Sequence, residues 1–293
     1  MRPQIGITLG DPAGIGPEVV EAARRSDRLS SAVEYRVVGQ YPTCTPSQPT
    51  PETARAAAAA LEEAVELGRR GEIAAVVTGP IHKARMYEIG FPFPGQTEFF
   101  AARTDTTNYA MLLTGGRLTV ALVTTHVPLH RVPELLTQNE IVRVGRLLAT
   151  FMQHRLRRAP RIAVAGLNPH AGESGTIGTE EEAIISPAIA ELNTDHRSPI
   201  TDHLFTGPFS PDTVFNRAVA GEFDAVLCMY HDQGLIPLKL HAFDEGVNVT
   251  LGLPFPRTSP DHGTAFEIAG KGIARPESMI AAINLAAELV LNR

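Results

Sequence analysis

The chain has 293 residues, of which 43% are hydrophobic and 20% charged, with a formal net charge of −6. This length allows one large or two modest domains, each with an ample core. The negative charge and the absence of tryptophan argue against a nucleic-acid surface, which needs basic patches and aromatic platforms. No apolar run approaches the roughly 20 residues that span a bilayer, and the first nine residues lack the pattern of a signal peptide. Cys44 and Cys228 lie far apart in sequence and in different contexts, so a reducing compartment fits better than a disulfide between them. We therefore expect a cytoplasmic protein that binds neither nucleic acid nor membrane.

Short apolar runs alternate with helical patterns along the chain. Residues 5–9 predict a buried strand, followed by a turn and a helix that opens at Pro17. The proline-rich residues 41–51 predict a loop. Gly115 and Gly116 separate two apolar runs and predict a hairpin. The other predicted strands are 73–78, 161–166 and 224–229, and the other predicted helices are 52–70, 139–157, 179–193 and 276–291. This alternation predicts an α/β architecture with mostly parallel strands.

Four polar, glycine-marked stretches follow apparent strands, which is where open α/β sheets bind ligands. The first, residues 10–18, has the wrong spacing for a dinucleotide fingerprint, and its glycines could equally form a tight strand-to-helix turn. Another gathers Lys239, Asn248 and Arg257, residue types that recognise phosphate or carboxylate, although each could be a solvated surface group. The last, residues 261–276, is a loop whose glycines allow close backbone approach to a ligand.

The remaining stretch is a set of histidines, each of which follows an apolar strand. A single histidine of this kind is more often structural, but His126, His170 and His231 follow three different strands. Strand ends in one sheet can converge, and neutral imidazoles suit a divalent ion such as zinc, cobalt, nickel or manganese. Asp232 and Asp261 could add oxygen ligands or orient the imidazoles.

These segments resemble the 4-hydroxythreonine-4-phosphate dehydrogenase family, part of the wider isocitrate and isopropylmalate dehydrogenase-like group. The resemblance covers nearly the whole chain, in the order of the family. The segments that carry it are residues 10–18, 77–83, 124–129, 166–173, 229–234 and 246–254. Residues 261–272 also resemble the adenosine-binding loop of the wider group.

The resemblance implies a two-domain α/β fold with the active site in the cleft between the domains. Residues 1–110 and 245–293 would form the cofactor-side domain, and residues 111–244 the metal-binding and dimerisation domain. It also implies a homodimer in which the two subunits share the active site.

The family's functional positions can be transferred to this sequence. The metal ligands fall on the three histidines already named, and the substrate contacts on Thr97, Lys239, Asn248 and Arg257. The cofactor positions fall on His262, Gly263, Thr264 and Ala265.

Two features depart from the family pattern. Ahead of Thr97 the family has Gly-His-Thr-Glu, whereas this chain has Gln96, which we still expect at the substrate. Glutamine can donate and accept hydrogen bonds but cannot carry a positive charge. Residues 40–52 form a shorter segment than in typical members, which we expect to trim a surface region and leave the chemistry alone.

The resemblance implies metal-dependent oxidation of 4-phosphooxy-L-threonine by NAD or NADP. The metal (zinc, cobalt, magnesium or manganese) would lower the pKa of the hydroxyl group, while Lys239 and Arg257 hold the phosphate. The resulting 3-keto acid would decarboxylate to 3-amino-2-oxopropyl phosphate. Lys83 and Asp232 are the candidate general bases.

Other functions fit the same residues. The nearest is a dehydrogenase of 4-phosphothreonate or 4-phosphoerythronate in sugar-acid catabolism, which the neutral Gln96 slightly favours. Oxidation of a non-phosphorylated dihydrodiol acid is disfavoured by Lys239, Asn248 and Arg257. A non-catalytic metal- or phosphate-binding protein is disfavoured by the intact histidine set.

Overall fold

A computed structural model describes residues 2–194 and 204–292 of the chain. The chain divides into two compact units. The first unit comprises Met1–Thr107 and Asp244–Arg293, and the second comprises Asn108–Phe243. Each unit has a largely parallel sheet with helices packed on it, which confirms the predicted α/β class.

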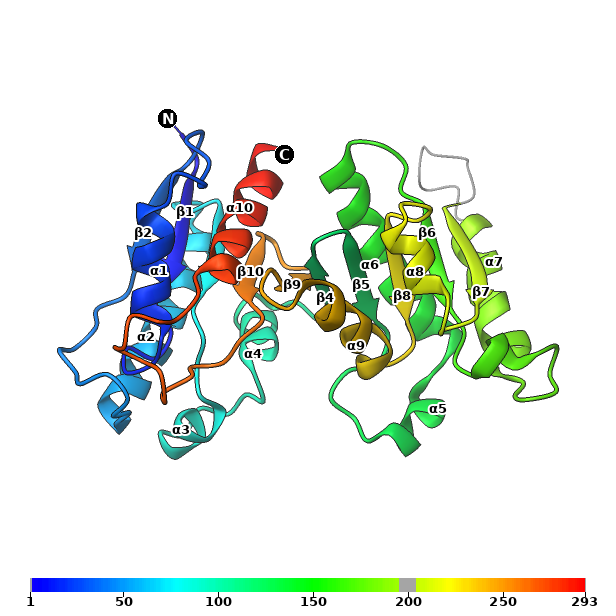
Figure 1. Ribbon diagram of the computed structural model, residues 1–293, viewed down its shortest axis with the longest axis horizontal. Coiled ribbons are helices and arrows are strands. Elements are labelled where there is room, and N and C mark those ends of the chain that lie inside the picture. Colours follow the sequence, from blue (N-terminus) through cyan, green and yellow to red (C-terminus); the bar gives the residue numbers. More distant parts are fainter. Residues whose placement is uncertain (1, 195–203, 293) are drawn as a thin grey trace. The chain divides into compact units, whose positions relative to one another are not determined.

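The strands of the first unit lie in the order β2-β1-β3-β10-β9 (Figure 1). Strand β1 pairs in parallel with β2 and β3, β3 pairs in parallel with β10, and only β9 runs antiparallel to its neighbour β10. The bounds are β1 Gln4–Thr8, β2 Glu34–Val38, β3 Ala75–Thr78, β9 Val247–Leu251 and β10 Arg257–Pro260.

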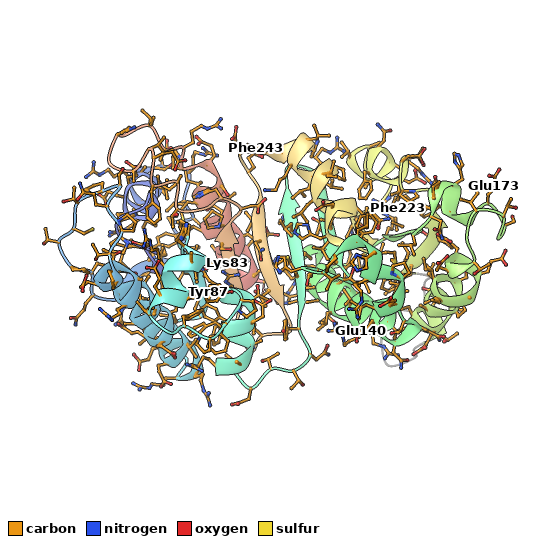
Figure 2. All side chains as sticks on the ribbon, turned by 90° about the horizontal axis from the view of Figure 1, so that it is seen from below. Lys83, Tyr87, Glu140, Glu173, Phe223 and Phe243 are labelled. Atoms are coloured by element: carbon orange, nitrogen blue, oxygen red, sulfur yellow. The ribbon has the colours of Figure 1, made fainter. Side chains whose placement is uncertain are left out.

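Helices cover this sheet. Helix α10 packs on β3, β9 and β10 and contacts α1, while α2 packs on β1, β2 and β3. Thr50 caps α2 through a reciprocal pair of hydrogen bonds with Thr53. The short α3 carries Lys83 and Tyr87, both exposed (Figure 2). The bounds are α1 Gly16–Arg25, α2 Pro51–Arg69, α3 Lys83–Glu88, α4 Gln96–Arg103 and α10 Glu277–Leu291.

The strands of the second unit lie in the order β4-β5-β8-β6-β7. Strands β4 and β5 form the antiparallel hairpin, and every other pair is parallel. The strand bounds are β4 Ala110–Gly115, β5 Leu118–Leu122, β6 Ile162–Ala165, β7 Phe205–Phe209 and β8 Ala225–Cys228. The helical segments are η1 Leu129–Arg131, α5 Val132–Leu135, α6 Gln138–Leu156, η2 Pro169–Gly172, the π-turn η3 Glu181–Ile185, α7 Ser186–Thr194, α8 Val214–Val219 and α9 His231–Ala242. Among the described residues, no helix combines the length and the apolarity needed to cross a bilayer.

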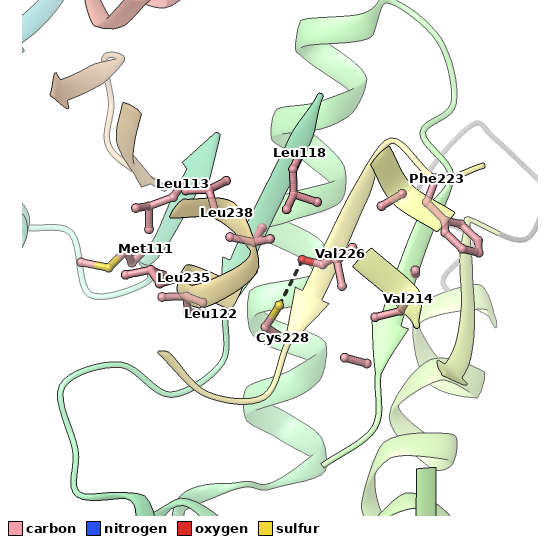
Figure 3. Packing of buried hydrophobic residues seen from close by; sticks show 14 residues of the cluster. Met111, Leu113, Leu118, Leu122, Val214, Phe223, Val226, Cys228, Leu235 and Leu238 are labelled. Carbon is pink, nitrogen blue, oxygen red and sulfur yellow. Dashed lines mark hydrogen bonds between the residues drawn. The ribbon is translucent and has the colours of Figure 1, made fainter. Parts of the chain in front are cut away.

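Alternate side chains of the second sheet build its core. Leu113, Leu122, Val226 and Cys228 face the helices α8 and α9, where they meet side chains such as Leu235 (Figure 3). Burial raises the pKa of the Cys228 thiol, so this cysteine is an inert core residue. The strand ends that follow this core are therefore held rigidly.

Most predicted elements are confirmed, but several were missed. Strands β2, β7, β9 and β10 and helices α3, α4, α5, α8 and α9 were not predicted. The stretch that holds Lys239, Asn248 and Arg257 follows β8, as expected. Within it, Lys239 lies in α9, Asn248 in β9 and Arg257 in β10. Strand β10 and helix α9 were missed because β10 has the sequence Arg-Thr-Ser-Pro and α9 contains Pro237, so neither has the local pattern of its element.

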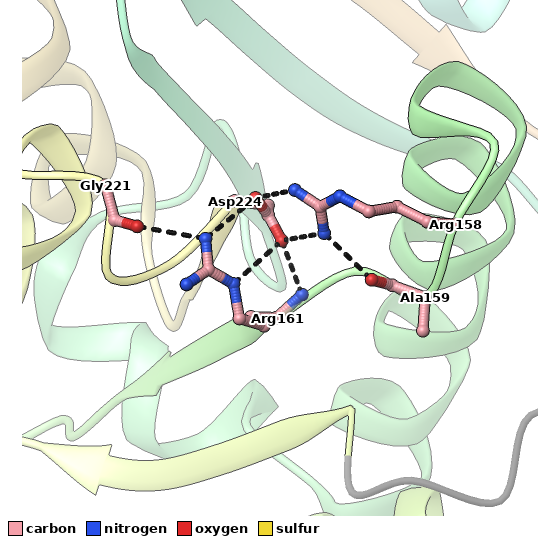
Figure 4. A network of polar contacts seen from close by, with 5 residues as sticks. All are labelled: Arg158, Ala159, Arg161, Gly221 and Asp224. Atoms are coloured by element: carbon pink, nitrogen blue, oxygen red, sulfur yellow. Dashed lines mark hydrogen bonds and ion pairs between the residues drawn. The ribbon is translucent and has the colours of Figure 1, made fainter.

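Asp224 ties the start of β8 to the segment before β6 (Figure 4). Its carboxylate accepts hydrogen bonds from Arg158 at 2.6 Å and from the backbone N–H of Arg161 at 2.7 Å. Burial alone would raise the pKa of Asp224, but the hydrogen bonds from the two arginines outweigh it and hold the pKa well below its usual value. The ionised carboxylate therefore stabilises the folded state.

Replacing Asp224 with asparagine should lower the free energy of unfolding by about 1–2 kcal/mol at pH 7, because the arginine heads are half exposed and partly screened. A carboxyl group whose pKa is lower in the folded state stabilises the fold at pH values above its unfolded-state pKa. This stabilisation is lost as the pH falls toward the folded-state pKa. The difference in the free energy of unfolding between the two proteins should thus narrow below about pH 4. Urea unfolding of both proteins at several pH values measures this, and a gap that widens in acid would contradict it.

Candidate functional site

One face of the first sheet carries a cluster of polar side chains around Arg257. Thr258 pairs with Val249 in antiparallel register, so Arg257 lies opposite Thr250 and the two side chains share a face. Arg257 also pairs with Val76 in parallel register, which places Thr78, two residues further along, on that face.

The guanidinium of Arg257 is held by neutral acceptors. Its Nη2 donates to Thr78 Oγ1 at 2.6 Å and to Gln96 Oε1 at 2.8 Å, and Nη1 donates weakly to Thr250 Oγ1 at 3.4 Å. The group lies 5.6 Å from the centroid of the Phe100 ring, which shields it from water. Arg257 is only 3% exposed.

This buried cation makes no ion pair within the part of the chain that the structure describes. Burial lowers the pKa of Arg257 to about 10, with a smaller opposing influence from the Glu98 carboxylate. Arg257 is therefore charged at neutral pH. Its Nε–H is buried and lacks an acceptor among the described residues. A buried charge of this kind is stabilised by a bound anion.

The structure brings four of the five predicted substrate residues to this sheet face or to the helix above it. Gln96 and Thr97 begin α4, and Thr97 Oγ1 lies 3.4 Å from Thr250 Oγ1. Asn248 lies two residues before Thr250 on the same face, and its buried Oδ1 has no partner among the described residues. Lys239 is a residue of the second unit, on α9.

The predicted histidines follow adjacent strands of the second unit. Strands β5, β8 and β6 are neighbours and parallel, so their carboxyl ends meet at one edge. Thr124 donates to the carbonyl oxygen of Met229 at 2.8 Å, and Gln233 bridges the Met229 N–H and the Gly166 carbonyl oxygen. These buried hydrogen bonds tie together the three segments that carry the histidines.

Two of the three histidines lie close together. The ring centroids of His126 and His231 are 5.5 Å apart. His231 Nδ1 lies 2.6 Å from Asp232 Oδ1, a contact that orients the imidazole ring. His170 is exposed, with a left-handed φ of 52°. Within residues 2–194 and 204–292, no three His, Cys, Asp or Glu side chains come close enough to hold a metal ion. The three-histidine metal site stays a prediction.

A buried glutamate holds the segment that presents His170. Glu181, 2% exposed, accepts hydrogen bonds through Oε1 from the backbone N–H groups of Leu167 and Asn168, both at 2.7 Å. Its Oε2 accepts from Asn168 Nδ2 at 2.9 Å. A Cβ at Gly172 would lie 2.7 Å from Oε2, so glycine is needed for this close approach. The carboxylate therefore organises the turn after β6.

The predicted cofactor loop follows β10 in the first unit. Thr264 is buried, and its carbonyl oxygen accepts from the Ile15 N–H at 2.9 Å. Burial lowers the pKa of His262, so its imidazole is neutral at pH 7, and its buried Nε2 has no partner among the described residues. A neutral ring nitrogen without a partner can bind a polar group of a cofactor. Gly263 and Ala265 complete this loop.

The loop also contacts two segments near the start of the chain. One is residues 10–16, where the Ile15 N–H donates to the Thr264 carbonyl oxygen. In this segment a Cβ at Gly16 would lie 1.8 Å from the Leu9 carbonyl oxygen, so tight packing explains this glycine. In the proline-rich segment, Ser47 Oγ donates to the carbonyl oxygens of Phe266 and Ala269. This short segment thus supports the predicted cofactor loop in addition to forming surface.

Several residues of the site were missed in the sequence. Thr78 and Thr250 resemble ordinary strand residues, although a polar residue in an apolar strand was a usable signal. Glu181 stands in a run of three glutamates that is typical of a solvated helix face, and only its burial distinguishes it. Ser47 gave no signal within its loop. Of the candidate bases, Lys83 is exposed and Asp232 is paired with His231.

The chain is similar to one enzyme family both in sequence and in structure. Residues 15–286 match the family model described as pyridoxal phosphate biosynthetic protein PdxA. A 4-hydroxythreonine-4-phosphate dehydrogenase of Desulfosudis oleivorans is 44% identical, over 97% of this chain and 95% of that protein. The crystal structure of the enzyme of that name from Klebsiella pneumoniae superposes with a TM-score of 0.86 at 36% identity, covering 99% of this chain and 98% of the other. Isocitrate dehydrogenase from Methylococcus capsulatus shares the fold, with a TM-score of 0.56 at 17% identity over 99% of this chain and 85% of that one.

Replacing Glu181 with glutamine should lower the free energy of unfolding by about 1–3 kcal/mol, because an amide nitrogen would face donors that need an acceptor. The exposed neighbour Glu182 provides a matched control, because Glu182→Gln should change the free energy of unfolding by less than about 0.5 kcal/mol. Urea unfolding measures both changes. Hydrogen exchange should show faster exchange of the Leu167 and Asn168 amides in the Glu181 variant, and unchanged protection would contradict the role of this carboxylate.

Proposed function

Because the chain belongs to the family of the pyridoxal phosphate biosynthetic protein PdxA, whose relatives are dehydrogenases, we propose that it oxidises 4-phosphooxy-L-threonine with NAD or NADP. The reaction would depend on a divalent metal and yield a 3-keto acid that decarboxylates to 3-amino-2-oxopropyl phosphate. The observation that carries the substrate assignment is the buried, charged Arg257, which has no ion pair within the described residues.

The polar face of the first sheet would bind the substrate. Arg257 would hold the phosphate, with Thr97 and Lys239 as further donors, and fix the position of the reacting carbon. The buried Oδ1 of Asn248 can accept a hydrogen bond from a hydroxyl or ammonium group. A substrate with a phosphate and such a group therefore matches these side chains.

His126, His170 and His231 would hold the metal ion. Imidazole nitrogens suit zinc, cobalt or manganese, and the contact between Asp232 and His231 is typical of a carboxylate that orients a metal-binding histidine. The ion would supply Lewis-acid polarisation of the substrate's oxygen atoms. Since Asp232 is engaged with His231, we assign it this orienting role and keep Lys83 as the candidate general base.

His262, Gly263, Thr264 and Ala265 would bind the nicotinamide cofactor, which supplies the hydride acceptor. The unpartnered Nε2 of His262 supports this assignment, as does the exposed Gly263, where the backbone is open to a ligand. Ser47 would hold the loop in place from the other side.

A second candidate substrate is 4-phosphothreonate or 4-phosphoerythronate. The neutral Gln96, where the family pattern has histidine, favours this alternative because it changes the group next to Arg257. Both candidates use the same phosphate site and the same metal.

Exposed apolar side chains support the proposed homodimer. On α9, Ile236 and Leu240 lie one turn apart and are 59% and 84% exposed, and Phe243 follows at 70% (Figure 2). Leu129, close after His126, is 67% exposed. We propose that a second copy of the chain covers these side chains and that the two copies share the active site.

The substrate is identified by following NADH formation with 4-phosphooxy-L-threonine and 4-phosphothreonate side by side. Each is assayed with and without a chelator and again after divalent metal is restored. We expect turnover of the amino acid that is lost by more than about tenfold on chelation, since Lewis-acid catalysis contributes several kcal/mol. Preference for the threonate would support the alternative substrate, whereas turnover indifferent to chelation would contradict the metal site.

Replacing Leu240 with glutamate should dissociate the dimer, because a carboxylate would be buried in an apolar interface at a cost of several kcal/mol. Sedimentation velocity measures the change in mass, and dehydrogenase activity should fall with it. As a control, Leu291→Glu alters an exposed leucine of α10, 46% exposed, and should leave the mass unchanged. A Leu240 variant that keeps the wild-type mass would contradict an interface on α9.

A further inference from the structure

We infer that Gln96 is a positioning residue for Arg257, and that it acts on substrate binding through this arginine instead of touching the substrate itself. The inference rests on the proposed function, in which Arg257 binds the phosphate group.

The amide of Gln96 is used at both ends. Its Oε1 accepts from Arg257 Nη2 at 2.8 Å, and its Nε2 donates to the carbonyl oxygen of Gly79 at 3.0 Å. Gly79 is a fixed anchor, because its N–H donates to Thr8 and a Cβ at this position would lie 2.4 Å from the Leu9 backbone. Gln96 therefore links Arg257 to a rigid part of the backbone.

These contacts fix the plane of the guanidinium. Nη2 has two hydrogens, and the short bonds to Thr78 and Gln96 use both. The buried Nε–H is left without an acceptor among the described residues, and Nη1 makes only the long contact to Thr250. The donors left for an anion are thus on Nε and Nη1, in an orientation that Gln96 helps to set.

A neutral amide suits this task because it orients the cation without neutralising it. A carboxylate at position 96 would form a buried ion pair with Arg257 and compete with the substrate's phosphate. A protonated histidine would have no lone pair to accept from the guanidinium, whereas a neutral histidine could accept. Glutamine combines a fixed acceptor with a fixed donor.

The experiment is a double-mutant cycle of Gln96→Ala and Arg257→Met. The readouts are the steady-state constants for the phosphorylated hydroxy acid that the wild type oxidises, and the rise in Tm caused by inorganic phosphate. Gln96→Ala should raise KM by about tenfold, as for a lost hydrogen bond to a charged group, with kcat nearly unchanged. In the Arg257→Met background, Gln96→Ala should change kcat/KM by less than about twofold.

Two further variants separate positioning from a general loss of structure. Gln96→His at pH 8, where imidazole is neutral, should recover most of the wild-type KM. Gln138 is a matched control: it also begins a helix, and its Nε2 donates to Glu191 at 2.9 Å. Gln138→Ala should leave KM unchanged. If Arg257→Met does not fold, Arg257→Lys takes its place in the cycle.

If Gln96→Ala lowers kcat/KM as much in the Arg257 variant as in the wild type, the inference is overturned. Such a loss would show direct contact of Gln96 with the substrate. An unchanged KM for Gln96→Ala alone would also overturn it. If the wild type oxidises no phosphorylated hydroxy acid, the proposed function fails. In that case phosphate protection still tests the inference, since Gln96→Ala should lower the protection of the wild type and leave that of the Arg257 variant unchanged.

Discussion

The buried guanidinium of Arg257 is the constraint around which the first unit is organised. Removing a charge from water is costly, and among the described residues every hydrogen-bond acceptor of this guanidinium is a neutral side chain of β3, β9 or α4. Such a site holds its positive charge ready for an anion, at the expense of some folding stability. The strand register places Thr78 and Thr250 beside Arg257, and α4 adds Gln96, so the cluster depends on both the sheet and this helix.

The second unit places its candidate histidines at the carboxyl ends of parallel strands: after β5, in η2 after β6, and at the first residue of α9 after β8. The apolar core ends at the carboxyl edge of β5, β6 and β8, and buried polar side chains take over from there. Gln233 links two of the loops, and Glu181 fixes the backbone around Asn168. These carboxylate and amide contacts hold the backbone that carries the candidate ligands.

Part of the candidate site could be predicted because a histidine directly after an apolar strand is a local signal in the sequence. An apolar run followed by a histidine marked β5, β6 and β8, and their adjacency in one parallel sheet is confirmed. Arg257 was identified by residue type, but its surroundings were not, because β10 consists of polar residues and proline. The neighbours Thr78 and Thr250 come from strands far apart in the chain, and only pairing brings them together.

The sequence by itself determined the α/β class, most of the elements, the family and the residue types of the site. These depend on periodicity, turn chemistry and ordered motifs, all of which are local. The tertiary structure alone decided that Arg257 is buried with no ion pair among the described residues, and that Gln96 joins it to Gly79. It also decided that one glutamate of three is buried, while its neighbours contact solvent. The physical reason is that burial and hydrogen-bond partners depend on which distant segments meet, and no local pattern records this.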